Sequence, residues 1–175
     1  TAQLVDELRT RAHDPSVYVE LAEGCTYRFT DPSDYLFGRN ALPAIYGELF
    51  VEGHGATLLR APEATGTFRL LAVPGQESGA TQKPGFVSLH DVTIRGFVAR
   101  GGDGGVAAGQ PDAICGGGGA AGLGGAFFVE GTLDLSAVSL LENRAIGGNG
   151  AGGSKLGAPA APIPCAGGGG LGGAG

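Results

Sequence analysis

The sequence predicts an all-β solenoid that begins with one amphipathic helix. Short β segments follow one another with glycine turns and no helices between them. One segment of the chain occurs twice, and each copy is followed by a glycine-rich tract, a cysteine and a further run of glycines. Short strands of this kind build sandwiches, barrels and solenoids. The internal repeat favours the solenoid among them.

The first element is expected to be a helix within residues 1–14. Its apolar residues recur at the spacing of one helix face: Leu4, Val5, Leu8 and Ala12. Pro15 ends this helix, because a proline disfavours the helical conformation in the residue before it. Residues 17–100 then read as strands joined by glycine turns, as in VYVELAEGCTYRF and ELFVEGHGATLLRA.

The repeat consists of residues 85–102 and 131–148, GFVSLHDVTIRGFVARGG and GTLDLSAVSLLENRAIGG, at an offset of 46 residues. In a solenoid, equivalent residues of successive turns stack about 4.8 Å apart, and loops leave from the same corner. A sandwich gives no reason for a loop to recur in register. We therefore expect the second copy to stack on the first.

Glycine supplies 36 of the 175 residues, which is roughly three times its usual share of about 7%. The segment GGGAAG at 117–122 matches G-x-G-x-x-G, but it precedes a strand and not a helix, so no dinucleotide cofactor is expected. The segment GGDGGVAAG resembles a calcium-binding Gly/Asp repeat only at its start, because Val106 stands where that repeat needs an aspartate ligand, so no calcium site is expected. The tracts also lack a strict three-residue period, which argues against polyproline II helices packed into a flat, ice-binding surface.

The charge of the chain limits its partners. A formal net charge of −6 and a pI near 4.9 argue against nucleic acid, since phosphate binding needs clustered Lys and Arg. No run of 18 apolar residues is present, so insertion into a membrane is not expected. No signal peptide is visible, so we expect either a cytoplasmic protein or a mature form without its leader.

Several motifs resemble a known family. VYVELAEGCTYRFTDP, NALPAIYGELFVEGHGATLLRAP and GLGGAFFVEGTLDLSAVSLLENRAIGGNG are similar, in this order, to bacterial right-handed parallel β-helix repeat proteins of the pectin-lyase-like superfamily. The adhesin-like, secreted or surface-exposed members are the most similar. One departure is His54, where the family motif GNGATI has Asn. The resemblance implies a right-handed parallel β-helix, an N-terminal capping helix, and an extracellular or cell-surface location. The superfold hosts enzymes, adhesins and structural proteins alike.

On this interpretation, residues 1–175 form a single β-helix domain, expected to be the N-terminal part of a longer solenoid. Its parts are the capping helix (1–14), the first coils (17–100), a glycine-rich loop (101–125), the repeat coil (126–146) and a second glycine-rich loop (147–175). Ala174 aligns with Ala126, where a new coil should begin. An open coil exposes unpaired backbone groups that invite another strand. The partners we expect are a polysaccharide, or another protein chain at this open C-terminal coil.

The three cysteines are Cys25, Cys115 and Cys165, and the absence of any C-x-x-C pair removes a zinc site. Cys115 and Cys165 hold equivalent places in consecutive loops. If these loops stack, their Cα atoms lie about 5 Å apart, inside the disulfide range of about 4.4–6.8 Å. We expect this pair to form a structural disulfide, which fits an oxidising location. Cys25 is expected to be buried in its strand as a small hydrophobe.

Enzymes with this fold use clusters of carboxylates and a basic residue on one sheet face. The candidates are Asp91, Arg95, Asp134, Glu142, Glu52 and His54. In the repeat alignment, no position stacks two carboxylates, so we interpret these side chains as solvated surface charges and turn residues. His54 is expected in a turn, and His90 in a strand facing solvent. No catalytic residue, metal or cofactor is assigned.

The sequence therefore favours a non-enzymatic, secreted or cell-surface protein with a structural or adhesive role. One alternative is a carbohydrate-active β-helix enzyme, a polysaccharide lyase or glycoside hydrolase, with its active site outside this segment. The other alternative is a self-assembling subunit that stacks through its open C-terminal coil.

Overall fold

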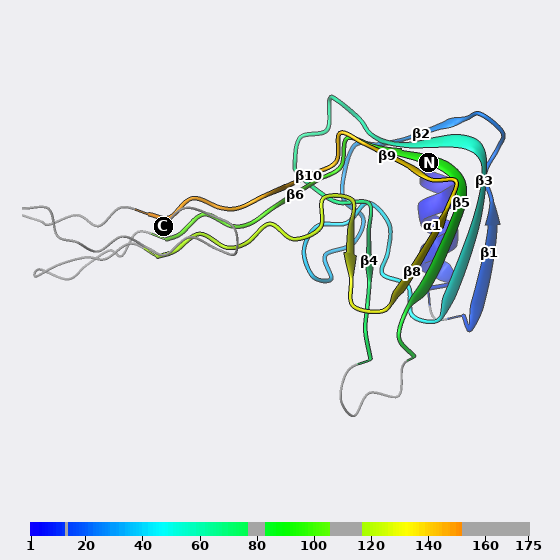
Figure 1. The fold of residues 1–175 in the computed structure, drawn as a ribbon, viewed down its shortest axis with the longest axis horizontal. Coiled ribbons are helices and arrows are strands. Elements are labelled where there is room, and N and C mark those ends of the chain that lie inside the picture. The colour runs from blue at the N-terminus through cyan, green and yellow to red at the C-terminus, as the bar shows by residue number, and fades with distance from the viewer. Residues whose placement is uncertain (13, 77–82, 106–116, 152–175) are drawn as a thin grey trace, which may run out of the picture. The chain divides into compact units, whose positions relative to one another are not determined.

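A computed structural model describes residues 1–12, 14–76, 83–105 and 117–151. This part of the chain is mainly β, with one N-terminal helix (Figure 1). Its elements are α1 (Ala2–Thr10), β1 (Ser16–Glu20), β2 (Thr26–Phe29), β3 (Glu48–Arg60), β4 (Leu71–Val73), β5 (Phe86–Arg95), β6 (Val98–Arg100), β7 (Phe127–Val129), β8 (Thr132–Ser136), β9 (Ser139–Leu141) and β10 (Arg144–Ile146). The chain divides into two compact units, unit 1 (Thr1–Ala99 and Gly124–Arg144) and unit 2 (Arg100–Leu123 and Ala145–Gly175).

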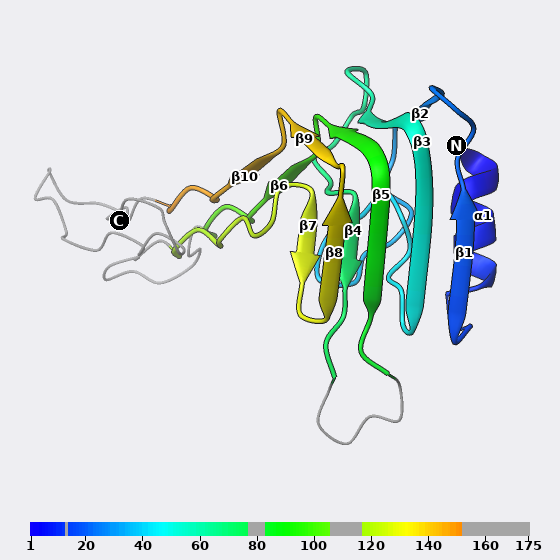
Figure 2. The same ribbon diagram turned by 45° about the vertical axis from the view of Figure 1, so that its right-hand side comes forward.

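The main sheet of unit 1 is parallel and orders its strands β1-β3-β5-β8, with β2 also paired to β3 and β9 to β5. Figure 2 shows β1, β3, β5 and β8 side by side in this order. A second parallel sheet joins β4 to β7, and β6 pairs with β10. Phe86 lies opposite Thr132, and Thr93 lies opposite Ser139. This register confirms the 46-residue offset of the repeat.

The core of unit 1 consists of apolar columns that run across the main sheet. One column is Val17, Leu49, Val87 and Leu133, and the next is Val19, Val51, Leu89 and Leu135. Alternate residues of a strand point to opposite faces of the sheet, so each column lies on the inner face. The first three members of both columns are buried, whereas Leu135 on β8 is 38% exposed. The column is thus covered from β1 to β5 and open at β8.

Helix α1 covers the other end of this strand order. Leu4 and Leu8 are buried in the same apolar cluster as Leu21 and Leu49, and Figure 2 shows α1 beyond β1. A helix packed by one apolar stripe is what the spacing of these leucines predicts. The helix ends at Thr10, earlier than the predicted 14, because Arg11 already caps it and Asp14 N–H bonds back to Arg11 O in a turn.

The chain bends within β3, within β5 and between β8 and β9 at residues in the left-handed backbone region. His54, Asp91 and Ala137 have φ of 48°, 48° and 53°, a region that side chains other than Gly, Asn and Asp seldom adopt. Beside the bend in β3, a Cβ on Gly53 would lie 2.3 Å from the carbonyl oxygen of Asp91. Gly53 is therefore required by the close approach of two backbones.

Unit 2 is described in residues 100–105, 117–123 and 145–151. In each segment, the backbone N–H groups that donate to another segment are three residues apart. In the first segment, Gly101 donates to Ile146 O and Gly104 donates to Asn149 O. The donors of the other two segments are Gly117 and Ala120, which bond Gly105 O and Gly102 O, and Gly148 and Ala151, which bond Ala120 O and Gly117 O. Three residues per turn is the repeat of the polyproline II helix. The tracts were expected to lack a strict three-residue period, but a period of three is present in these hydrogen bonds and in the glycines that meet a neighbouring backbone, Gly101 and Gly104 in one segment and Gly119 and Gly122 in another.

The glycines of unit 2 divide into required and free positions. A Cβ on Gly104 would lie 1.9 Å from Gly117 O, and one on Gly148 would lie 1.9 Å from Gly102 O. A Cβ on Gly105 would meet nothing within 4 Å. Glycine is therefore required only where the residue faces a neighbouring backbone. The glycines at the other positions obscure the three-residue period in the sequence.

The cysteine predictions have different outcomes. Cys25 is a free thiol, but it is exposed, so its predicted burial was wrong. It precedes β2 in a turn closed by the bond from Cys25 N–H to Ala22 O, and so it does not belong to the inward-facing positions of a strand. Cys115 and Cys165 lie outside the described residues, and their disulfide stays a prediction.

Candidate functional site

The outer face of the main sheet presents its side chains in two rows. One row contains Tyr18, Phe50, Ser88 and Asp134, and the second contains Glu20, Glu52, His90 and Ser136. Neighbouring members of a row are about 4.8 Å apart, because each row crosses the strands of the sheet. The two rows are two residues apart along each strand and therefore share one face.

The first row begins with an aromatic stack. The rings of Tyr18 and Phe50 are nearly parallel, at 10°, with centroids 4.8 Å apart, and Phe86 packs 5.6 Å from Phe50. Tyr18 is 68% exposed. The stack holds Tyr18 in one orientation, so that a flat aromatic surface faces solvent at the β1 edge of the sheet.

The second row is charged. His90 Nδ1 lies 2.7 Å from Glu52 Oε1, and both side chains are about half exposed. The hydrogen bond with Glu52 raises the pKa of His90, and the charges of Glu52 and then Asp91 add to this effect. Glu20 lies opposite Glu52 in the register of β1 and β3. Within the repeat no two carboxylates stack, as expected, but the earlier passes β1 and β3, which the repeat alignment did not cover, place Glu20 beside Glu52.

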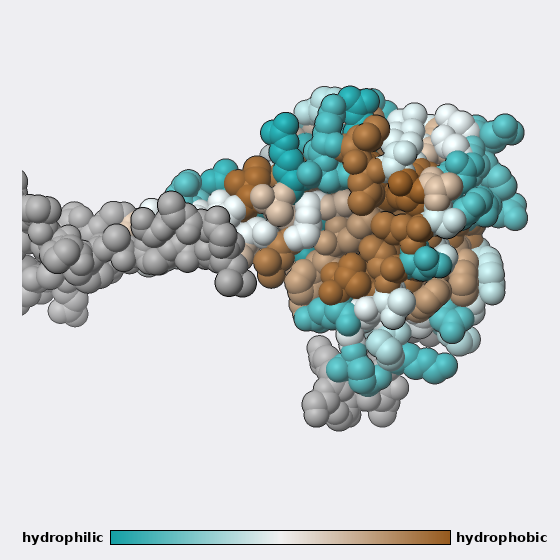
Figure 3. All heavy atoms as spheres, viewed as in Figure 1, coloured by the Kyte–Doolittle hydropathy of each residue, from teal (hydrophilic) through white to brown (hydrophobic). Residues whose placement is uncertain are grey.

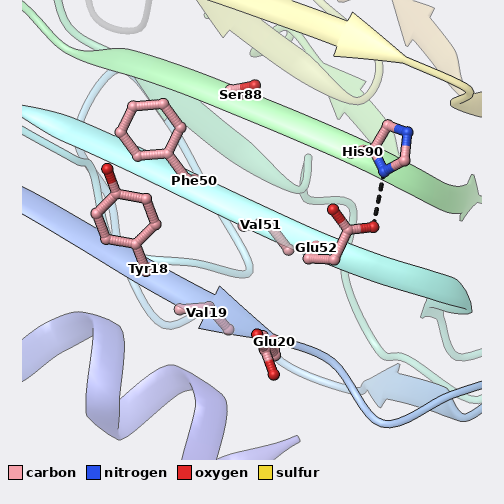
Figure 4. A pocket seen from close by; sticks show the side chains of 8 residues that line it. All are labelled: Tyr18, Val19, Glu20, Phe50, Val51, Glu52, Ser88 and His90. Carbon is pink, nitrogen blue, oxygen red and sulfur yellow. Dashed lines mark hydrogen bonds and ion pairs between the residues drawn. The ribbon is translucent and has the colours of Figure 1, made fainter.

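The two rows border a shallow hollow of about 250 Å³. Figure 4 shows Tyr18 and Phe50 with their rings side by side at one end, and Glu52 joined to His90 at the other. Ser88 lies along β5, and Glu20 lies at the end of β1. The hollow thus offers an aromatic face, carboxylate acceptors and an imidazole, which are groups that hold a polar ligand with an apolar side.

The remaining predicted candidates do not join this group. His54 was expected in a turn, but it lies within β3 at the register shift between Glu52 and Ala56. Asp91 lies within β5. His90, which does line the hollow, is the exposed strand residue that was predicted. Asp134 lies opposite Ser88 on β8 and is exposed. Arg95 pairs with Glu142 through two hydrogen bonds of 3.0 Å each.

A second hollow, of about 460 Å³, contains Arg60, Arg95, Glu142 and Arg144. Two of its three arginines already have partners within the chain. Glu142 binds Arg95, and Arg60 donates to the carbonyl oxygens of Ala64 and Gly66. The hollow beside Tyr18 is the better candidate, because most of its polar groups remain available to a ligand.

The described residues contain neither a metal site nor a membrane-spanning helix. No group of three or more His, Cys, Asp or Glu is placed to hold a metal ion in residues 1–12, 14–76, 83–105 and 117–151. In the same residues, no helix has the length and apolar character needed to cross a membrane. Comparisons of the chain with models of protein families, with curated proteins and with solved structures found no match.

Most of this site was not expected from the sequence. Glu52 and His90 were considered only singly, and Tyr18, Phe50 and Glu20 were not among the expected site residues. The available signal was the alternation in SVYVE and ELFVE, in which an aromatic and a glutamate occupy the same two outward positions. Aligning these two pentapeptides would have stacked Tyr18 on Phe50 and Glu20 on Glu52.

Proposed function

We propose that this chain belongs to a secreted or cell-surface protein with a structural and adhesive role, built as a right-handed parallel β-helix. The observation that carries the proposal is the parallel order β1-β3-β5-β8 with its registered side-chain rows. The same strands bury apolar columns on one face and repeat aromatic and charged rows on the other. Such an arrangement gives a rigid support for an exposed, ordered binding face.

The β-helix itself is supported by the succession of elements. Four consecutive passes of the chain place strands in parallel register on one sheet, and β4 and β7 pair in parallel as a second sheet. The corner residues Asp91 and Ala137 occupy equivalent places in the last two passes, with nearly equal φ. Repetition of both strands and corners is the pattern of a coil that stacks on itself.

The experiment is retention of polysaccharides on the immobilised chain, together with an assay for newly formed reducing ends and unsaturated products. An adhesive protein is expected to retain at least one polysaccharide and to leave its chain length unchanged. Cleavage of any retained polysaccharide would overturn the non-enzymatic proposal. Failure to retain any member of a broad panel would overturn the adhesive one.

A second candidate function is self-assembly, which the exposed apolar residues of the last strands favour. They are Val129, Leu135, Leu140 and Leu141, each between 38% and 49% exposed. Figure 3 shows apolar side chains gathered on the face of unit 1 turned to the viewer. In the part of the chain that the structure describes, β8 pairs only with β5, so its second edge is open to another strand.

A further inference from the structure

We infer that the hollow beside Tyr18 binds a sugar residue of a neutral oligosaccharide. This inference rests on the adhesive role proposed above and names its ligand. The proposal combines the exposed ring of Tyr18, the hollow next to it and the row of Glu20, Glu52 and His90 on the same sheet face.

The aromatic stack matches one side of a sugar ring. A pyranose has a face of C–H groups, which packs on a flat aromatic surface through dispersion and weak C–H contacts. Phe50 lies behind Tyr18 at 4.8 Å, so the ring is already held in place before a ligand arrives. A preorganised side chain loses little conformational entropy on binding.

The charged row matches the edge of the sugar. Hydroxyl groups are donors and acceptors, and ionised carboxylates are acceptors only. Glu20 and Glu52 therefore accept hydrogen bonds from hydroxyl groups, while His90 is fixed by Glu52 at 2.7 Å. Hydrogen bonds to charged groups are stronger than those between neutral ones.

The charge of the hollow selects against acidic sugars. Its lining contains two glutamates and one histidine, and no Lys or Arg. A uronate would bring a third carboxylate next to Glu20 and Glu52 without a guanidinium to pair it, and such like charges repel. Pockets for drug-sized ligands span about 300–1,000 Å³, so a hollow of about 250 Å³ suits one or two sugar rings.

The test uses the full chain, with neutral cello-, malto- and chito-oligosaccharides and oligogalacturonate as probes, and measures affinity by calorimetry. At least one neutral probe is expected to bind more tightly than oligogalacturonate. Tyr18→Ala is expected to weaken this binding about tenfold or more. Glu52→Gln is expected to weaken it severalfold.

Matched controls lie elsewhere on the chain. Tyr35 is 67% exposed, and Glu63 forms an exposed ion pair with Arg28, so Tyr35→Ala and Glu63→Gln are expected to leave binding unchanged. Unchanged affinity in Tyr18→Ala would overturn this site while leaving the adhesive role standing. Absence of binding to every neutral probe would overturn the inference outright, whether or not another polymer is retained. Thermal unfolding of each variant distinguishes loss of the site from loss of the fold.

Discussion

At the scale of single residues, the Glu52–His90 pair makes the stability of the outer face depend on pH. Glu52 raises the pKa of His90 above 6.5 in the folded chain. The contribution of the pair is therefore complete below about pH 6.5, the unfolded pKa, and is lost as the pH rises through the higher folded value. We expect Glu52→Gln to lower the unfolding temperature at acidic pH and to leave it unchanged at alkaline pH. NMR titration should find the pKa of His90 closer to 6.5 in this variant.

Glu63→Gln is the control, because the pKa of Glu63 is lowered in the folded chain, so its contribution to stability depends on pH in the opposite direction. The hydrogen bond from Arg28 holds the pKa of Glu63 below 4.5, so this contribution is present above about pH 4.5 and is lost as the pH falls through the folded pKa. The two variants should thus diverge from the parent chain in different pH windows. Equal effects of Glu52→Gln at acidic and alkaline pH would contradict the assignment.

Arg69 is a second residue whose substitution tests a physical contribution to stability, here the cost of a buried guanidinium against its contact with the Phe128 ring. It is 7% exposed, its Nε and Nη1 have no hydrogen-bond partner among the described residues, and burial lowers the pKa of its guanidinium. A buried charge without a partner pays a desolvation cost that an apolar side chain of similar length does not pay. Arg69→Met is therefore expected to raise the free energy of unfolding by about 1–2 kcal/mol, measured by urea denaturation, despite the lost contact with the Phe128 ring.

Arg60 provides the matched comparison for Arg69. It also lies over an aromatic ring, that of Phe68 at 5.2 Å, but it donates to the carbonyl oxygens of Ala64 and Gly66. Arg60→Met leaves those acceptors without their donor and is expected to lower the free energy of unfolding by about 1–3 kcal/mol. A change of the same sign in both variants would contradict this account of Arg69.

At the scale of elements, unit 2 depends on glycine at particular places. A methyl group on Gly104 would lie 1.9 Å from Gly117 O, whereas one on Gly105 meets nothing within 4 Å. Gly104→Ala is expected to cost about 1–3 kcal/mol or more, as overpacking does. Gly105→Ala should be neutral or stabilise by up to about 1 kcal/mol. Both stability changes can be measured by hydrogen exchange of the Ala120 and Gly148 amides, which bond within unit 2. Equal protection of these amides in the two variants would contradict the close backbone contact at Gly104.

The elements also explain what could be predicted from the sequence. The last two passes of unit 1 share one offset of 46 residues, so their register was visible as a repeat. The first two passes pair at an offset of 32, from Ser16 to Glu48, and the next at 38, from Glu48 to Phe86. The differing spacings between successive passes hid this register, and with it the stacking of Tyr18 on Phe50. In unit 2, glycines that meet nothing, such as Gly105, obscure the three-residue spacing of the glycines that a neighbouring backbone requires, such as Gly101 and Gly104.

At the scale of the whole molecule, the two ends of the strand order in unit 1 differ. At β1 the apolar columns are covered by α1 through Leu4 and Leu8, whereas at β8 one column ends on the partly buried Leu133 and the other on Leu135, which is 38% exposed. Exposed apolar area next to an open strand edge is what association with another strand uses. Because α1 occupies the β1 end, contact between two copies through their β8 ends buries apolar area on both partners.

This asymmetry gives the last prediction. Leu135 and Leu140 continue the columns of the buried Leu89 and Ile94, and they are 38% and 49% exposed. If the β8 end associates, the mass measured by light scattering should rise with concentration in the parent chain. Replacing both leucines by lysine should abolish the rise, because charged edges oppose pairing. Tyr35→Lys, at an exposed site elsewhere, should not. A parent chain of constant mass, or lysine variants that still associate, would remove the β8 edge as an assembly surface.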